Sequence, residues 1–161
     1  MRRPLPPPSP PLRARGFTLL ELMVVVSLSA LVLGLAAPAL DRLVAAQRLR
    51  TTSFNLVSDL TLARSESLKR SAPVQLAPAT TGWPDGWSVQ VVANGQVLGR
   101  RQPLGPVQVT QAPTRIVFND RGQLDAADPV RISLADGHGG GRCIVLDPSG
   151  RPRAMPTSCT E

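Results

Sequence analysis

An apolar run near the N-terminus is the dominant pattern of this chain. From Phe17 to Leu40 the side chains are apolar, apart from hydroxyl groups and the single carboxylate of Glu21. A helix of this length reaches across a lipid bilayer, so the run predicts a membrane-spanning helix. A carboxylate inside such a segment is costly and indicates a function that requires a partner.

A second pattern extends from Asp41 to Arg70, where no glycine or proline interrupts the chain. Small and apolar residues recur at steps of three and four, which predicts an amphipathic helix. Gly34 and Pro38 predict a kink in the preceding span, and Pro73 ends the helix. The predicted apolar face comprises Leu43, Ala46, Leu49, Ser53, Leu56, Val57, Leu60, Ala63 and Ser67, and the polar face carries Arg42, Arg48, Arg50, Asp59, Arg64, Glu66 and Lys69.

Short valine-, isoleucine- and leucine-rich runs follow Pro73, separated by turn residues such as Asn94-Gly95, a strong hairpin signal. They predict strands at Val74–Leu76, Trp87–Val92, Gln96–Arg101, Val107–Thr110, Arg115–Phe118, Val130–Leu134 and Cys143–Leu146. A helix followed by antiparallel strands indicates an α+β fold, with the long helix packed on a C-terminal antiparallel β-sheet domain. We expect Trp83 and Trp87 to cap a small core rather than to stack on a ligand.

The charge distribution predicts how the chain is oriented in a membrane. The formal net charge is +7, and residues 1–16 are proline-rich and carry four arginines. Positive charge before an apolar run keeps that end in the cytoplasm, so residues 41–161 are expected on the far side of the membrane. A small-residue signal-peptidase site at Ala36-Ala37 fits poorly beside Pro38. A cut between Gly16 and Phe17 would instead leave the whole helix on the mature protein.

The segment Gly16–Val25, GFTLLELMVV, resembles the type IV prepilin motif. The resemblance implies that residues 1–16 are a leader, removed between Gly16 and Phe17 by a prepilin peptidase, and that Phe17 is N-methylated. It further implies that Glu21 pairs with the Phe17 amine of a neighbouring major or minor pilin, the counter-charge that a buried carboxylate needs. A plain signal-anchored domain is the alternative, but it requires neither the glycine nor the glutamate.

Later segments resemble the GspH/FimT branch of this superfamily, which holds minor type IV pilins and minor pseudopilins. The segments are Ala63–Ser67, Gly82–Val89, Ile116–Gly122, Cys143–Leu146 and Gly150-Arg151. The resemblance implies a type IV pilin fold and a single-pass protein of the bacterial inner membrane that moves to the pilus and cell surface. In such a protein residues 17–40 would form the transmembrane and filament-core helix, and residues 41–161 the periplasmic domain.

The C-terminal tail carries the candidate binding residues. Gly150-Arg151-Pro152-Arg153 resembles a Gly-Arg-x-Arg element of FimT-type minor pilins that bind double-stranded DNA in natural transformation. Two guanidinium groups on an extended segment suit successive phosphates, and Arg142 is a third candidate. Alternatively, these arginines are ordinary solvent-exposed charges at the edge of the domain and bind nothing. If the domain lies outside the cytoplasm, a disulfide between Cys143 and Cys159 is favoured, and it would close the tail into a loop.

The sequence therefore predicts a non-enzymatic minor type IV pilin that binds extracellular DNA weakly and without sequence preference. Its alternative is a GspH-like minor pseudopilin, a structural tip component of type II secretion. No catalytic set or cofactor motif stands out, and with only His138 and two separated cysteines a metal site is not expected.

Overall fold

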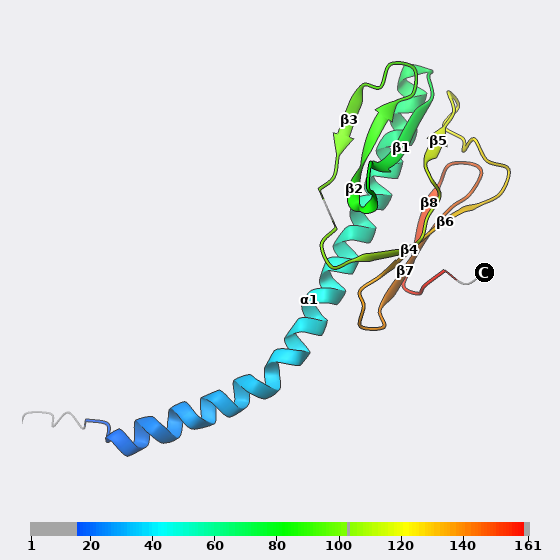
Figure 1. The fold of residues 1–161 in the computed structure, drawn as a ribbon. Coiled ribbons are helices and arrows are strands. Elements are labelled where there is room, and N and C mark those ends of the chain that lie inside the picture. Colours follow the sequence, from blue (N-terminus) through cyan, green and yellow to red (C-terminus); the bar gives the residue numbers. More distant parts are fainter. Residues whose placement is uncertain (1–15, 103, 160–161) are drawn as a thin grey trace, which may run out of the picture. The chain divides into compact units, whose positions relative to one another are not determined.

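The computed structural model describes residues 16–102 and 104–159, and the chain divides into two compact units, Met1–Ala39 and Leu40–Glu161. One helix, α1 (Leu19–Arg70), runs through both units, and eight strands follow it (Figure 1). The strands are β1 (Val74–Ala79), β2 (Gly82–Val91), β3 (Val97–Arg100), β4 (Gln108–Gln111), β5 (Ile116–Phe118), β6 (Val130–Ala135), β7 (Gly141–Leu146) and β8 (Pro152–Met155). The predicted leader lies outside the described residues, except for Gly16.

The start of α1 is a capped helix terminus. The Glu21 backbone N–H donates to the Thr18 hydroxyl at 3.2 Å, and Leu22 N donates to the Thr18 carbonyl at 3.2 Å. Thr18 and Glu21 have the spacing of a capping box, in which a hydroxyl satisfies a free N–H of the first turn. The Glu21 carboxylate in that turn also complements the positive end of the helix dipole.

Apolar side chains of the first unit are exposed along the described part of the helix. Phe17 and Leu19 are 83% and 77% exposed, and the large apolar residues that follow are all at least half exposed up to Leu33. By length and composition, no unbroken helix of the described residues is suited to cross a membrane. The segments Leu19–Gly34 and Pro38–Arg70 have the length and composition of one membrane span only when they are taken together.

The strands form the expected antiparallel β-sheet domain, and they divide between two sheets, a division that the sequence did not predict. Sheet A has the order β3-β2-β1-β5, and sheet B has the order β4-β6-β7-β8. The chain passes from sheet A to sheet B at β4, returns at β5 and then builds the rest of sheet B. This exchange depends on pairings between strands distant in sequence, which local alternation does not encode. Strand β8 is not among the strands predicted from the sequence.

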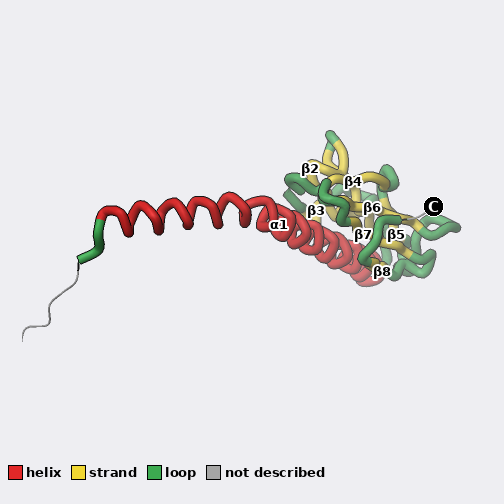
Figure 2. Tube along the Cα trace, turned by 90° about the horizontal axis from the view of Figure 1, so that it is seen from below, coloured by secondary structure: helices red, strands yellow, loops and turns green. Residues whose placement is uncertain are grey.

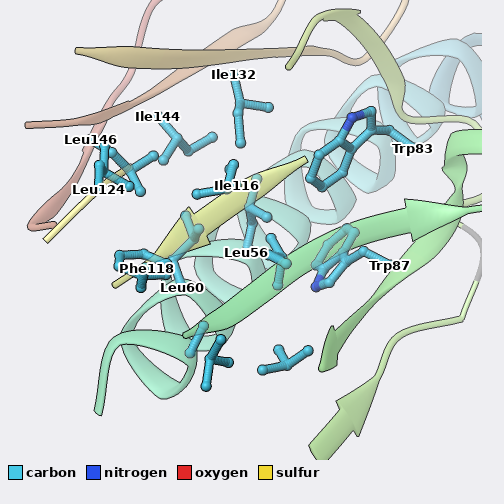
Figure 3. Close-up of a cluster of buried hydrophobic side chains, with 14 of the residues drawn as sticks. Leu56, Leu60, Trp83, Trp87, Ile116, Phe118, Leu124, Ile132, Ile144 and Leu146 are labelled. Atoms are coloured by element: carbon cyan, nitrogen blue, oxygen red, sulfur yellow. The ribbon is translucent and has the colours of Figure 1, made fainter. Parts of the chain in front are cut away.

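The second unit has one hydrophobic core, to which α1 and both sheets contribute. The strands lie alongside the C-terminal half of α1 (Figure 2). Leu56 and Leu60 of the helix point among side chains of both sheets, including Phe118 and Ile144 (Figure 3). Every buried residue of the described chain lies between Leu49 and Gly150. The core is thus contained in Leu40–Glu161, so this unit has what it needs to fold without the preceding segment.

The predicted apolar face of the helix is correct only from Leu49 onward. Leu49, Ser53, Leu56, Leu60, Ala63 and Ser67 are buried, and Val57 is half-buried against the core. Leu43 and Ala46 are exposed because the core begins one turn later. Asp59 was expected on the polar face but is also buried. The reason is its hydrogen bonding: its carboxylate accepts from Trp87 Nε1 at 2.8 Å and from Arg101 Nε at 2.7 Å and Nη2 at 3.0 Å.

Both tryptophans belong to the core, as expected. Trp83 and Trp87 are buried, and their ring centroids are 6.3 Å apart. Each indole N–H has a partner, since Trp83 donates to the Pro113 carbonyl and Trp87 donates to Asp59. A buried aromatic ring with a satisfied N–H is a packing element, and β2, which starts five residues before the predicted strand, carries both rings.

Candidate functional site

The C-terminal arginines lie on and beside β8, the edge strand of sheet B. A tight turn joins β7 to β8: Gly150 N donates to the Asp147 carbonyl at 2.8 Å, and Asp147 N donates to the Arg151 carbonyl at 3.3 Å. Arg151 and Arg153 are both exposed, and Pro152 pairs with Leu146. The strand pairing therefore holds the two arginines in an extended segment, where alternation puts them on one face.

Gly150, the first residue of the arginine element, is buried and serves the turn. Its φ of 77° lies in the left-handed region, and a Cβ there would overlap the Gly122 carbonyl oxygen. Only glycine fits such a position without strain. Its contribution to the candidate site is therefore to place Arg151, because it has no surface of its own to present.

The strand register shows which residues share a face with the arginines. Val145 pairs with both Arg153 and Arg131, and paired residues of antiparallel strands point to the same side of a sheet. The alternate residues of β6 and β7, Ile132, Leu134, Ile144 and Leu146, are buried in the core. Arg131 and Arg153 therefore lie on the face of sheet B that points away from the core, here called the outer face.

Arg131 carries no sequence signal that marks it as a binding residue. It lies 22 positions from Arg153 in the chain, and no local motif connects the two. The alternation of β6 does predict that Arg131 and Ser133 point away from Ile132 and Leu134, but only the pairing of β6 with β7 and of β7 with β8 places Arg131 in the same row as Arg153.

Arg142 is not brought together with the tail arginines. It pairs with Leu134, which belongs to the core side of sheet B, so its side chain starts from the opposite face. There it borders a cavity of about 460 Å³ between the glycine-rich β6–β7 loop and the helix residues Ala46 and Leu49. The grouping of Arg142 with Arg151 and Arg153 expected from the sequence does not form.

Charge on the outer face is mostly positive. Arg153 Nη2 lies 3.4 Å from Asp147 Oδ2, and both side chains are more than a third exposed, so this is a weak surface ion pair. Among residues 16–102 and 104–159, Arg131 and Arg151 form no ion pair within 4.0 Å. The outer face thus carries three guanidinium groups and one partly paired carboxylate.

A disulfide joins Cys143 of β7 to Cys159, as the sequence predicted. Cys159 N donates to Ser133 Oγ at 3.4 Å, which places the tail over the outer face next to β6 and β7. For this reason Ser133 and Cys143 are buried although their strand positions point away from the core. Glycine at position 141 lets the tail pass close to β7, since a Cβ there would overlap Ser158 of the tail.

Two family descriptions match this chain. Residues 54–150 match the type II transport protein GspH, and residues 12–37 match the prokaryotic N-terminal methylation motif. The pilin-like protein PilA1 of Thermus thermophilus is 32% identical over 158 residues, an alignment covering 86% of this chain and 97% of that protein.

The chain belongs to the GspH/FimT family of minor pilins and pseudopilins.

Solved structures share the fold of this GspH/FimT-family pilin. Two crystal forms of the type IV minor pilin FimU from Pseudomonas aeruginosa superpose with TM-scores of 0.59 and 0.58 at 22% identity. They cover 71% and 70% of this chain, and 96% and 100% of the FimU chains. The helix packed on antiparallel sheets is therefore a type IV pilin fold, as the sequence predicted.

The family assignment indicates the role of the N-terminal residues. The methylation motif indicates a membrane-anchored, pilus-associated protein that is processed as a prepilin and associates with other pilins. Gly16 and Phe17 precede the helix, and Glu21 is exposed in its first turn. The exposed apolar surface around them is the kind that a lipid or a neighbouring helix covers.

The remaining candidate groups are the histidine, cysteine and carboxylate side chains. Within residues 16–102 and 104–159, no group of three or more histidine, cysteine, aspartate or glutamate side chains is arranged to hold a metal ion. His138 lies exposed in the β6–β7 loop, where its backbone N–H donates to Asp136 Oδ1 at 2.8 Å. The family and its fold are those of structural components.

Proposed function

We propose that this minor pilin binds extracellular double-stranded DNA through Arg151 and Arg153 and takes part in DNA uptake during natural transformation. The observation that carries the proposal is that both guanidinium groups are exposed on one face of a paired, turn-anchored edge segment. An extended strand places alternate side chains about 6.6 Å apart, close enough for both to reach the closely spaced phosphates of one duplex.

The construction of the tail lowers the entropic cost of binding. Pairing with β7 and the Cys143–Cys159 disulfide already order the segment that carries the arginines, so less freedom is lost when DNA binds. Two or three phosphate contacts give weak affinity that is independent of sequence and falls with salt. Several subunits in one filament would raise the apparent affinity through avidity.

The test uses the unit Leu40–Glu161, because the arginines of the leader would contact phosphates themselves. We expect the Arg151→Ala and Arg153→Ala double variant to weaken binding of a fluorescent 30-base-pair duplex by roughly tenfold or more at ~50 mM salt. The measurement is fluorescence anisotropy, with circular dichroism to establish that each variant is folded.

The matched control is the double variant Arg100→Ala with Arg115→Ala. It removes the same charge from exposed arginines on and beside sheet A strands. Equal weakening by both double variants would mean that only net charge matters and would reject the tail as the site. Unchanged binding by the tail variant would reject it as well.

We further propose the course of assembly. Residues 1–16 are a leader that is cleaved between Gly16 and Phe17, Phe17 is N-methylated, residues 17–40 occupy the inner membrane, and residues 41–161 face the periplasm. The methylation-motif match over residues 12–37 and the apolar helix that follows the cut support this division.

A second candidate function is a minor pseudopilin of type II secretion, which the description of the matching GspH family favours. A pseudopilin at a filament tip contacts other pseudopilins and needs no DNA. Deletion of the gene would then block export of folded proteins and leave transformation intact, whereas loss of transformation with normal export supports the DNA-binding function.

A further inference from the structure

We infer that Arg131 of β6 is a third DNA-contacting residue and that the DNA footprint extends across three strands of sheet B. This inference rests on the proposed function and adds to it a residue that lies outside the tail. Arg131, Val145 and Arg153 form one row across β6, β7 and β8 on the outer face. Two strand spacings separate the ends of the row, a distance of about 9.6 Å between Cα atoms.

The row leaves both arginines accessible to a ligand. Arg131 and Arg153 are exposed, and the residue between them, Val145, is too short to stand in the way of either guanidinium group. Farther along the same face, the disulfide-linked tail covers Ser133 and Cys143, so the accessible part of the outer face is the end that carries the arginines.

Electrostatics favour Arg131 as a phosphate ligand. Asp147 is the carboxylate paired with Arg153, and it reduces the attraction of that arginine for an anion. Arg131 has no such partner among the described residues. Arg131, Arg151 and Arg153 form a triangle of charges spread over two dimensions, which suits the surface of a duplex better than the two tail arginines alone do.

The structural alternative is that Arg131 only keeps the sheet soluble. A charged residue on the exposed face of a strand commonly has no other role. The two roles differ in the salt dependence of DNA binding, because each phosphate contact contributes about 0.9 to the slope of log K against log salt. A residue that never meets DNA leaves this slope unchanged.

The experiment measures duplex binding by the unit Leu40–Glu161 at several salt concentrations. We expect Arg131→Ala to weaken binding roughly three- to tenfold at ~50 mM salt and to reduce the magnitude of the slope by about 1. Arg131→Lys should retain the slope, since a lysine also contacts phosphate. Arg100→Ala, an exposed arginine of sheet A, is the matched control and should change neither quantity.

The outcomes separate this inference from the proposed function. If Arg131→Ala behaves like Arg100→Ala while the tail double variant loses binding, the extended footprint is wrong and the tail site stands. If the unsubstituted protein binds no DNA at low salt, the proposed function and this inference are both wrong.

Discussion

At the scale of single residues, Asp59 shows how a partner changes the meaning of a charge. In the sequence it is one of several charged positions on a helix, but in the fold it links α1 to β2 and to Arg101, the residue after β3. Its hydrogen bonds raise the pKa of Arg101 above the ordinary value, although partial burial of Arg101 acts in the opposite direction. A buried carboxylate is tolerated here because both partners donate to it.

Replacing Asp59 tests this link. We expect Asp59→Ala to lower the free energy of unfolding by about 2–3 kcal/mol, because it leaves the buried Trp87 N–H without an acceptor. The ion pair adds less than a fully buried one, since Arg101 is 41% exposed. Urea denaturation followed by circular dichroism gives the change, and Asp120→Ala, at an exposed turn, is the control. A loss no larger than that of the control would contradict the link.

At the scale of elements, the β6–β7 hairpin is organised by a carboxylate in a loop that looks featureless in the sequence. Asp136 Oδ1 accepts from the backbone N–H groups of His138 and Gly140, both at 2.8 Å. These hydrogen bonds, led by that from His138, lower the pKa of Asp136, although burial opposes them. Gly140 leaves room for this carboxylate, since a Cβ there would overlap Asp136 Oδ2 and displace the side chain from its hydrogen bonds.

This geometry predicts a pH dependence of stability. Because the pKa of Asp136 is lower in the folded state, its contribution is complete above its unfolded pKa of about 3.9 and is lost as the pH falls through the folded value. We expect Asp136→Asn to cost about 1 kcal/mol at neutral pH and less at ~pH 3. The lower pH lies below the unfolded pKa, so protonation of the unfolded chain has begun to remove the contribution of the carboxylate there.

Urea denaturation at the two pH values measures the difference. Asp128→Asn, at an exposed loop position, serves as the control. The cost of this substitution in free energy of unfolding should not fall comparably between pH 7 and pH 3. A cost of Asp136→Asn that stays constant or grows as the pH falls would contradict the assigned hydrogen bonding.

At the scale of the whole molecule, the first unit is incomplete without neighbours. Its helix exposes large apolar side chains from Leu19 to Leu33, and the Glu21 carboxylate has no cationic partner within the described residues of its own chain. The core of the second unit, by contrast, is closed. The family assignment explains the difference, because a pilin subunit associates with other pilins.

Glu21 provides a test of assembly. We propose that Glu21 pairs with the Phe17 amine of a neighbouring subunit in the filament. On this proposal Glu21→Ala should leave the precursor processed and present in the membrane but reduce its recovery in sheared filaments by roughly tenfold or more, because that amine would lose its counter-charge. Immunoblots of the membrane and filament fractions measure this, with Thr18→Ala, which removes only the helix cap, as the control. Equal recovery of both variants in the filament fraction would show that assembly does not depend on the Glu21 carboxylate.

The sequence alone was sufficient wherever the physical signal is local. The three- and four-residue steps between Asp41 and Arg70 and the Asn94-Gly95 pair specify a helix with an apolar face and a hairpin, because each depends on residues within one or two turns of one another. The apolar run and the prepilin motif are local as well, and the match of residues 12–37 to the N-terminal methylation motif agrees with the motif.

Only the tertiary structure decided what depends on pairing across the chain. It placed β4 in sheet B and β5 in sheet A, and it buried Asp59. It also put Arg131 and Arg153 in one row on the outer face of sheet B and Arg142 on the opposite face. Alternation along a strand tells which side chains share a face of that strand, but it carries no information about which strand lies next or in which register. Those choices follow from burying one common core, a property of the whole domain.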